Sequence, residues 1–164
     1  MTDRSNYRRH SDAEDIGRIS DEIRSLAEEI KKTDREHKMA REVASAGNCY
    51  RAVNWNRLIK ILGEEPLAKA AVKTFYVDNI RRIELLRQAM NTGSLNQVRS
   101  LAHALKNSSE AVAVEEMSRA AAELEQKAKA SRLKDGWQAL EIIEAEYIKL
   151  QVLVSTKHWR EMPT

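Results

Sequence analysis

Apolar residues recur at intervals of three and four positions through most of this chain, and this spacing limits the fold more than any other feature. Steps of three and four place side chains on one face of an α-helix. Only 5 glycines and 2 prolines interrupt the 164 residues, and β-branched and aromatic residues never alternate with a period of two. The spacing therefore predicts an all-α protein without a β-sheet.

Turn signals divide the second part of the chain into one short helix and four long ones. Gly63 ends the short segment WNRLIKIL, and Pro66 suits the first turn of the next helix. The segments NTGS (91–94) and KDG (134–136) are further breaks. Long helices are expected over about 66–91, 95–112, 114–128 and 137–154. Four amphipathic helices with short connections predict an antiparallel up-down four-helix bundle, preceded by a short helix.

The N-terminal part carries a seam of large aliphatic residues at heptad spacing. The seam predicts a long helical extension and comprises Ile16, Ile19, Ile23, Leu26 and Ile30. A composition break at SAGNCYRAVN (45–54) leads us to predict an extension over 1–47, a bundle over 48–158 and a tail over 159–164. The seam can be buried against the chain's own bundle or against a second copy, and its narrow spacing favours a homodimer through residues 14–42.

Charge and cysteine content argue against several classes of function. The net charge is only +3, and basic and acidic residues are interspersed, so no concentrated patch for nucleic acid is expected. No apolar run is long enough to span a bilayer, and the N-terminus lacks the apolar region of a signal peptide. Cys49 is the only cysteine, which fits a reducing compartment. We therefore predict a cytoplasmic protein with no nucleic-acid or membrane partner.

One histidine lies in the middle of a helix-forming stretch, LAHALKNSSEAVAV (101–114). On a helical wheel, His103 falls about 160° from the centre of the apolar stripe, which places it on the solvent side. The apolar stripe itself comprises Val98, Leu101, Ala102, Leu105, Ser109 and Val112. Arg99, Lys106 and Asn107 lie three or four positions from His103 and share its outer face.

Two kinds of catalytic site are disfavoured around His103. No second histidine, cysteine or paired carboxylate stands at metal-ligand spacing on this face, so no metal is expected. A hydrolytic triad is disfavoured because Ser108 and Ser109 lie on or near the buried face, where their hydroxyls can bond to the carbonyls of Ala104 and Leu105. An ordinary surface histidine without a chemical role stays open at this point.

The residues around His103 resemble the phosphorylation motif of histidine-containing phosphotransfer (HPt) domains. That motif is roughly A-H-x-L-K-G-S followed by Ser or Ala, and residues 102–109 read A-H-A-L-K-N-S-S. The resemblance extends over about residues 50–155 and includes the short first helix and the long helices that follow. Two positions depart from the family, since Asn107 and Ala113 stand where it usually has glycine.

The resemblance implies a phosphocarrier. His103 would accept a phosphoryl group from an aspartyl phosphate, and an exposed imidazole is largely neutral and nucleophilic near neutral pH. Lys106 would stabilise the phosphoryl charge, with Arg99 as a second candidate, and Asn107 would either obstruct the partner or donate a hydrogen bond.

The partners implied are receiver domains of response regulators, a hybrid sensor histidine kinase, or both. No nucleotide-binding glycine loop is present, so we expect no ATP site and no cofactor on this chain; the receiver would supply Mg²⁺. The chain would then be a transfer intermediate rather than an enzyme. The alternative is a non-catalytic helical interaction or scaffold module, a relative of HPt domains that is not phosphorylated.

Overall fold

A computed structural model of the chain describes residues 51–155, together with positions 25, 29, 31, 32, 34 and 38. These six positions are helical and exposed. The chain divides into two compact units, Met1–Met39 and Ala40–Thr164. The predicted aliphatic seam, the domain boundary at 47/48 and the tail over 159–164 lie outside the described residues. The six described positions do not test the dimer predicted through residues 14–42.

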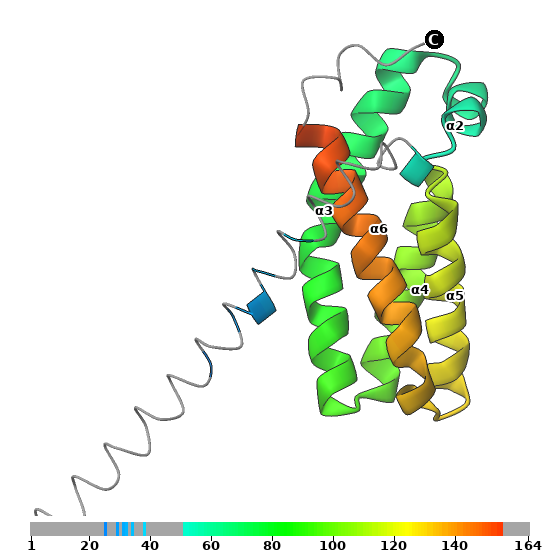
Figure 1. The fold of residues 1–164 in the computed structure, drawn as a ribbon. Helices are drawn as coiled ribbons and strands as arrows, with labels where there is room; N and C mark the ends of the chain where they lie inside the picture. The colour runs from blue at the N-terminus through cyan, green and yellow to red at the C-terminus, as the bar shows by residue number, and fades with distance from the viewer. Residues whose placement is uncertain are drawn as a thin grey trace, which may run out of the picture. The chain divides into compact units, whose positions relative to one another are not determined.

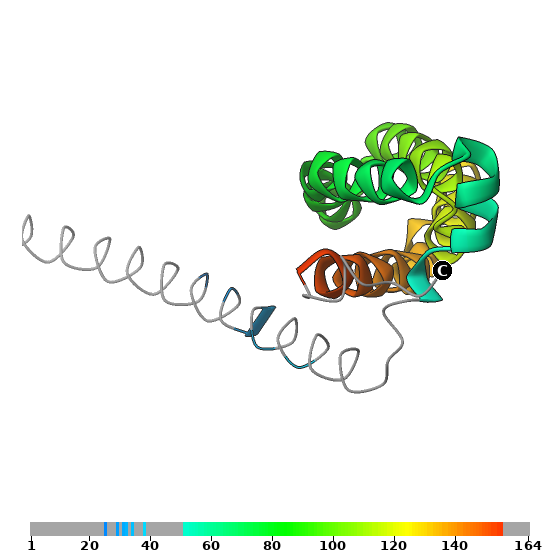
Figure 2. The same cartoon turned by 90° about the horizontal axis from the view of Figure 1, so that it is seen from above.

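The described part of the second unit is an all-α, antiparallel, up-down four-helix bundle with a short helix before it, as predicted (Figure 1). Helix α3 packs against α4 and α6, and α5 packs against the same two helices. The short α2 lies at one end of the bundle in Figure 1, and Figure 2 looks down the helices onto that end. The elements are α2 (Trp55–Leu62), α3 (Glu65–Thr92), α4 (Leu95–Ala111), α5 (Glu115–Lys129), the 3-10 helix η2 (Leu133–Gly136) and α6 (Trp137–Ser155).

The core lies where the apolar stripes of the four long helices meet. Burial of such side chains is the main favourable contribution to folding, at roughly 1.5–3 kcal/mol for each large aliphatic residue. Trp137 belongs to the apolar stripe predicted for the last helix, but it is 36% exposed because it is the first residue of α6. The fully buried residues of the long helices include Val72, Leu86, Val98, Leu105, Met117, Leu124, Leu140, Ile143, Leu150 and Leu153.

Within the described part of the chain, no helix combines the length and the apolar character that a membrane span requires.

Contacts to the connection between α4 and α5 hold α2 against the bundle. The Asn54 side chain caps α2 by accepting a hydrogen bond from the amide of Arg57 at 3.1 Å. The backbone N–H of Asn54 donates to the carbonyl of Ala113 at 2.9 Å. Asn54 Nδ2 and Arg57 both donate to Glu115, the first residue of α5. The same end of the bundle is thus fixed by backbone and side-chain bonds together.

Helices α3, α4 and α5 end in the same motif, with a left-handed residue after the last turn. The residues are Gly93, Ala113 and Ser131, with φ of 69°, 56° and 57°. At each end this residue donates to the carbonyl three positions earlier, and the next amide donates to the carbonyl five positions before itself. This pattern is the Schellman motif, in which glycine is preferred. The glycine that HPt domains carry at the position of Ala113 would suit this backbone.

Replacing Ser131 by glycine should stabilise the protein. Left-handed backbone costs a residue with a Cβ about 1–2 kcal/mol, and the greater freedom of glycine in the unfolded chain offsets about 0.5–1 kcal/mol of the gain. Ser131 is exposed, so no packing is lost. We expect Ser131→Gly to raise the free energy of unfolding by about 0.5–1 kcal/mol in urea denaturation.

The control is Ser100→Gly, at an exposed position inside α4. There glycine should lower the stability by up to about 0.5–1 kcal/mol, since the backbone is right-handed helix. A loss of stability in both variants would contradict the strain assigned to Ser131.

Candidate functional site

His103 projects from the outer face of α4, as predicted. Its side chain is 54% exposed, whereas Ala102 beside it is fully buried. Val98, Leu105 and Ser109 face the core and hold the helix in this rotation. The imidazole is therefore carried by a packed helix and is open to a partner molecule.

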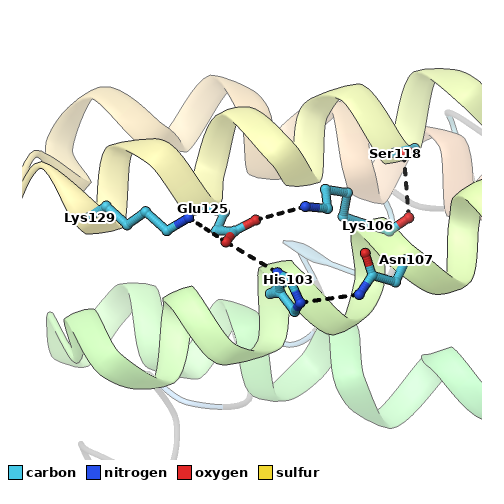
Figure 3. Close-up of polar contacts among 6 residues, drawn as sticks. All are labelled: His103, Lys106, Asn107, Ser118, Glu125 and Lys129. Carbon is cyan, nitrogen blue, oxygen red and sulfur yellow. Dashed lines mark hydrogen bonds and ion pairs between the residues drawn. The ribbon is translucent and has the colours of Figure 1, made fainter.

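A carboxylate on the neighbouring helix, that of Glu125 in α5, contacts the imidazole. Oε1 of Glu125 lies 3.2 Å from Nδ1 of His103 (Figure 3). The Glu125 side chain is only 6% exposed, because it points between the two helices. A carboxylate with so little access to water needs donors from the protein.

Three side chains supply those donors. Lys129 Nζ lies 2.7 Å from Oε1 of Glu125, and Lys106 Nζ lies 3.3 Å from Oε2. The third donor is His103. The hydrogen bond from Lys129 outweighs the opposing effect of burial and, together with the bonds from Lys106 and His103, lowers the pKa of Glu125 from 4.5 to about 2. Glu125 is therefore ionised at neutral pH.

An ionised carboxylate selects one tautomer of the neutral imidazole. A carboxylate can only accept hydrogen bonds, so the ring proton of His103 must lie on Nδ1. Nε2 then carries a lone pair. Its neighbour is the side-chain amide of Asn107, whose Nδ2 lies 3.1 Å away and donates to it (Figure 3). The contacts on the two sides of the ring thus agree that Nδ1 carries the proton and Nε2 carries the lone pair.

The four residues predicted for the site lie on α4, but they do not all meet at the imidazole. Lys106 points to Glu125 rather than alongside the ring, and Asn107 contacts the ring directly. Arg99 is exposed, one turn before His103. Among the described residues, no hydrogen bond or ion pair joins Arg99 to His103, Lys106 or Asn107.

The two serines after the motif have structural contacts. Ser109 is buried and donates to the carbonyl of Leu105 at 2.6 Å, as predicted. The prediction that Ser108 bonds to Ala104 is wrong, because its hydroxyl reaches the carbonyl of Leu105 at 3.1 Å instead, three positions back. Neither hydroxyl is directed to the imidazole.

Sequence reasoning missed Glu125 and Lys129, although one signal was available. Glu125 lies four residues after Ala121 and three before Ala128, both of which are on the buried stripe of α5. A charged residue inside such a stripe requires a partner. The partner could not be named from spacing, because Glu125 is 22 positions from His103 in the sequence.

No group of three or more His, Cys, Asp or Glu side chains is placed to hold a metal ion within the described residues. The His103 and Glu125 pair is completed by two lysines, and ammonium groups are not metal ligands. The arrangement is therefore that of an oriented nucleophile with cations beside it.

Comparison with known families agrees with this fold. The family model of the Hpt domain matches residues 70–153, which is more than half of the 164-residue chain and includes α4 and α5. The chain belongs to the Hpt domain family. Members of this family are histidine phosphotransfer modules of phosphorelays, which act with receiver domains and kinases and are not enzymes with an ATP site of their own. No curated protein and no solved structure gives a significant match.

The stability that Glu125 provides should depend on pH in the acid range. Its pKa is about 2 in the folded chain against 4.5 ordinarily, so its contribution is fully present above about pH 4.5 and is lost as the pH falls through 2. We expect Glu125→Gln to be less stable than wild type at pH 7 in urea denaturation. The difference between the two proteins should shrink steadily between pH 4.5 and pH 2.

Other carboxylates titrate in the same range, but they are common to both proteins and cancel in the difference. A difference that stays constant from pH 7 to pH 2 would contradict the ionised state assigned to Glu125.

Proposed function

We propose that His103 is the phosphoryl-accepting residue of this Hpt domain and carries the group between aspartates of receiver domains. One observation supports this assignment above the others. The imidazole is exposed, and a nearly buried, ionised Glu125 on its Nδ1 side leaves the lone pair on Nε2. An ordinary surface histidine has no such fixed tautomer.

The transfer step balances with the groups at this site. The Nε2 lone pair attacks phosphorus, the Nε2–P bond forms, and the P–O bond to the aspartate breaks, so that the aspartate leaves as a carboxylate with the bonding electrons. Nδ1 keeps its proton during attack, and the ring becomes formally positive. The Glu125 carboxylate, 3.2 Å from Nδ1, balances that charge as it develops. The reverse reaction passes the group to the next aspartate.

Cations on the outer face of α4 would stabilise the transferring group. Charge spreads over three equatorial oxygens in a loose transition state, and a nearby ammonium group lowers its energy. Lys106 is partly exposed and one turn from His103, so its flexible side chain can move from Glu125 to those oxygens. Arg99, one turn earlier, is the second candidate.

The partners supply the remaining groups that the transfer needs. A receiver domain, free or within a hybrid sensor histidine kinase, supplies the aspartyl phosphate and Mg²⁺, and this chain supplies no cofactor or ATP site. A cytoplasmic location fits a sequence whose only cysteine is Cys49.

Asn107 takes part in the step through its amide. The hydrogen bond from Nδ2 to Nε2 must break before attack, which costs about 0.5–1.5 kcal/mol for a neutral pair. Once rotated away, the same amide can donate to an anionic phosphoryl oxygen, and hydrogen bonds to charged groups contribute about 1.5–3 kcal/mol. The gain exceeds the loss, so Asn107 assists transfer.

Loss of the imidazole should abolish phosphorylation without unfolding the bundle. His103→Gln removes the nucleophile, its exposed side chain contributes little packing energy, and Lys106 and Lys129 remain on Glu125. We expect the variant to take no acid-labile, alkali-stable label from a phosphorylated receiver domain, while its circular dichroism and urea midpoint stay close to wild type. Label that persists, or that moves to His10, His37 or His158, would reject His103 as the acceptor. A folded wild type that takes no label would favour the scaffold alternative.

Removal of the Asn107 amide should slow transfer. Asn107→Ala loses the bond to the phosphoryl group and keeps helix propensity, so we expect a rate about 3- to 10-fold lower in rapid-quench transfer from a phosphorylated receiver domain. Asn107→Gly should be slowed similarly, and it also loses roughly 0.5–1 kcal/mol of stability. Faster transfer in both variants would mean that Asn107 obstructs the partner instead.

A further inference from the structure

Lys129 contacts the same carboxylate as Lys106 but comes from a different helix. Lys129 lies one turn after Glu125 on α5, and Lys106 lies one turn after His103 on α4. Figure 3 shows the two ammonium groups on opposite sides of Glu125. The two oxygens of Glu125 are divided between them, with Lys129 on Oε1 at 2.7 Å and Lys106 on Oε2 at 3.3 Å.

The two contacts differ in strength and in reach. The Lys129 bond is the shorter, and it is the largest cause of the lowered pKa of Glu125. Lys129 is on the Glu125 helix, at i+4, so the pair is local to α5. Lys106 is on the same helix as His103, so its ammonium group is the one that can reach a phosphoryl group bound to the imidazole.

Movement of Lys106 toward a phosphoryl group would remove one donor from Glu125. The Glu125 side chain is only 6% exposed, and a carboxylate in that position loses stability steeply when a cation is taken away. If Lys106 were the only lysine on Glu125, its departure would be opposed by that loss. With Lys129 in place, the carboxylate keeps an ammonium partner and its bond to Nδ1 of His103.

We propose that Lys129 is a positioning residue that stays on Glu125 during phosphotransfer and thereby frees Lys106 to move to the phosphoryl group on His103. The inference rests on the proposed function of His103 and adds a residue from α5 to the working site. Lys129 itself need not touch the phosphoryl group. Its role is to keep an ammonium group on Glu125 while the other lysine is away, so that the departure of Lys106 is not opposed.

The test compares Lys129→Met with a matched control on the same helix. Lys127 also forms an i,i+4 pair on α5, with Glu123 at 3.8 Å, so Lys127→Met removes a comparable surface charge away from His103. Transfer from a phosphorylated receiver domain to the full chain is followed by rapid quench over a range of receiver concentrations. We expect Lys129→Met to lower the maximal rate about 3- to 10-fold, with the half-saturating concentration changed less than about 2-fold. Lys127→Met should match wild type, and Lys129→Arg should recover most of the rate.

A second measurement separates this role from a general loss of stability. In a Lys106→Ala background no lysine has to leave Glu125, so adding Lys129→Met should slow transfer much less than it does in the wild-type background. Urea denaturation shows whether each variant is folded, and Lys129→Gln replaces Lys129→Met if the latter is not.

Three results would overturn the inference. The first is a Lys129→Met rate equal to that of Lys127→Met while wild type transfers normally. The second is an effect that is the same in both backgrounds, and the third is a change confined to the half-saturating concentration. A wild type that takes no label at His103 would instead overturn the proposed function, and the role of Lys129 with it.

Discussion

The carboxylate of Glu125 is the group on which the rest of the site depends. It is nearly buried between α4 and α5 and accepts hydrogen bonds from His103, Lys106 and Lys129. Those donors come from both helices, so the same contacts join the helices and set the proton on the imidazole. Fold and chemistry are therefore coupled through one ionised group.

The bundle gives this group a rigid frame. Helix α4 has no glycine or proline in its 17 residues, and its inward stripe is fully buried at Val98, Ala102 and Leu105. Ser118 on α5 adds a bond to the carbonyl of Lys106 at 3.3 Å, just beside the site. A side chain on such a packed element is held more closely than one on a loop. A phosphocarrier of this kind needs an oriented, exposed nucleophile rather than a deep pocket, since the partner brings the reacting phosphoryl group.

Properties that depend on residues within one or two turns could be predicted from the sequence. The outward direction of His103, the buried stripes and the helix ends at Gly63 and Gly93 are of this kind. The direction of Lys106 could not be predicted, because Glu125 on another helix competes for its ammonium group. The contacts of Ser108 likewise include a residue of another helix, since its hydroxyl lies 3.4 Å from Oδ1 of Asn79 on α3 as well as 3.1 Å from the carbonyl of Leu105. Pairing between helices is decided by packing, which spacing along one helix does not encode.

Whether Nε2 of His103 is the reacting atom is measured most directly by nuclear magnetic resonance of the phosphorylated, ¹⁵N-histidine-labelled chain. The contacts of Glu125 and Asn107 predict one phosphohistidine, at residue 103, with ³¹P–¹⁵N coupling to Nε2 and a proton on Nδ1 in the unphosphorylated protein. Coupling to Nδ1, or a ring proton on Nε2 before phosphorylation, would contradict the role given to Glu125.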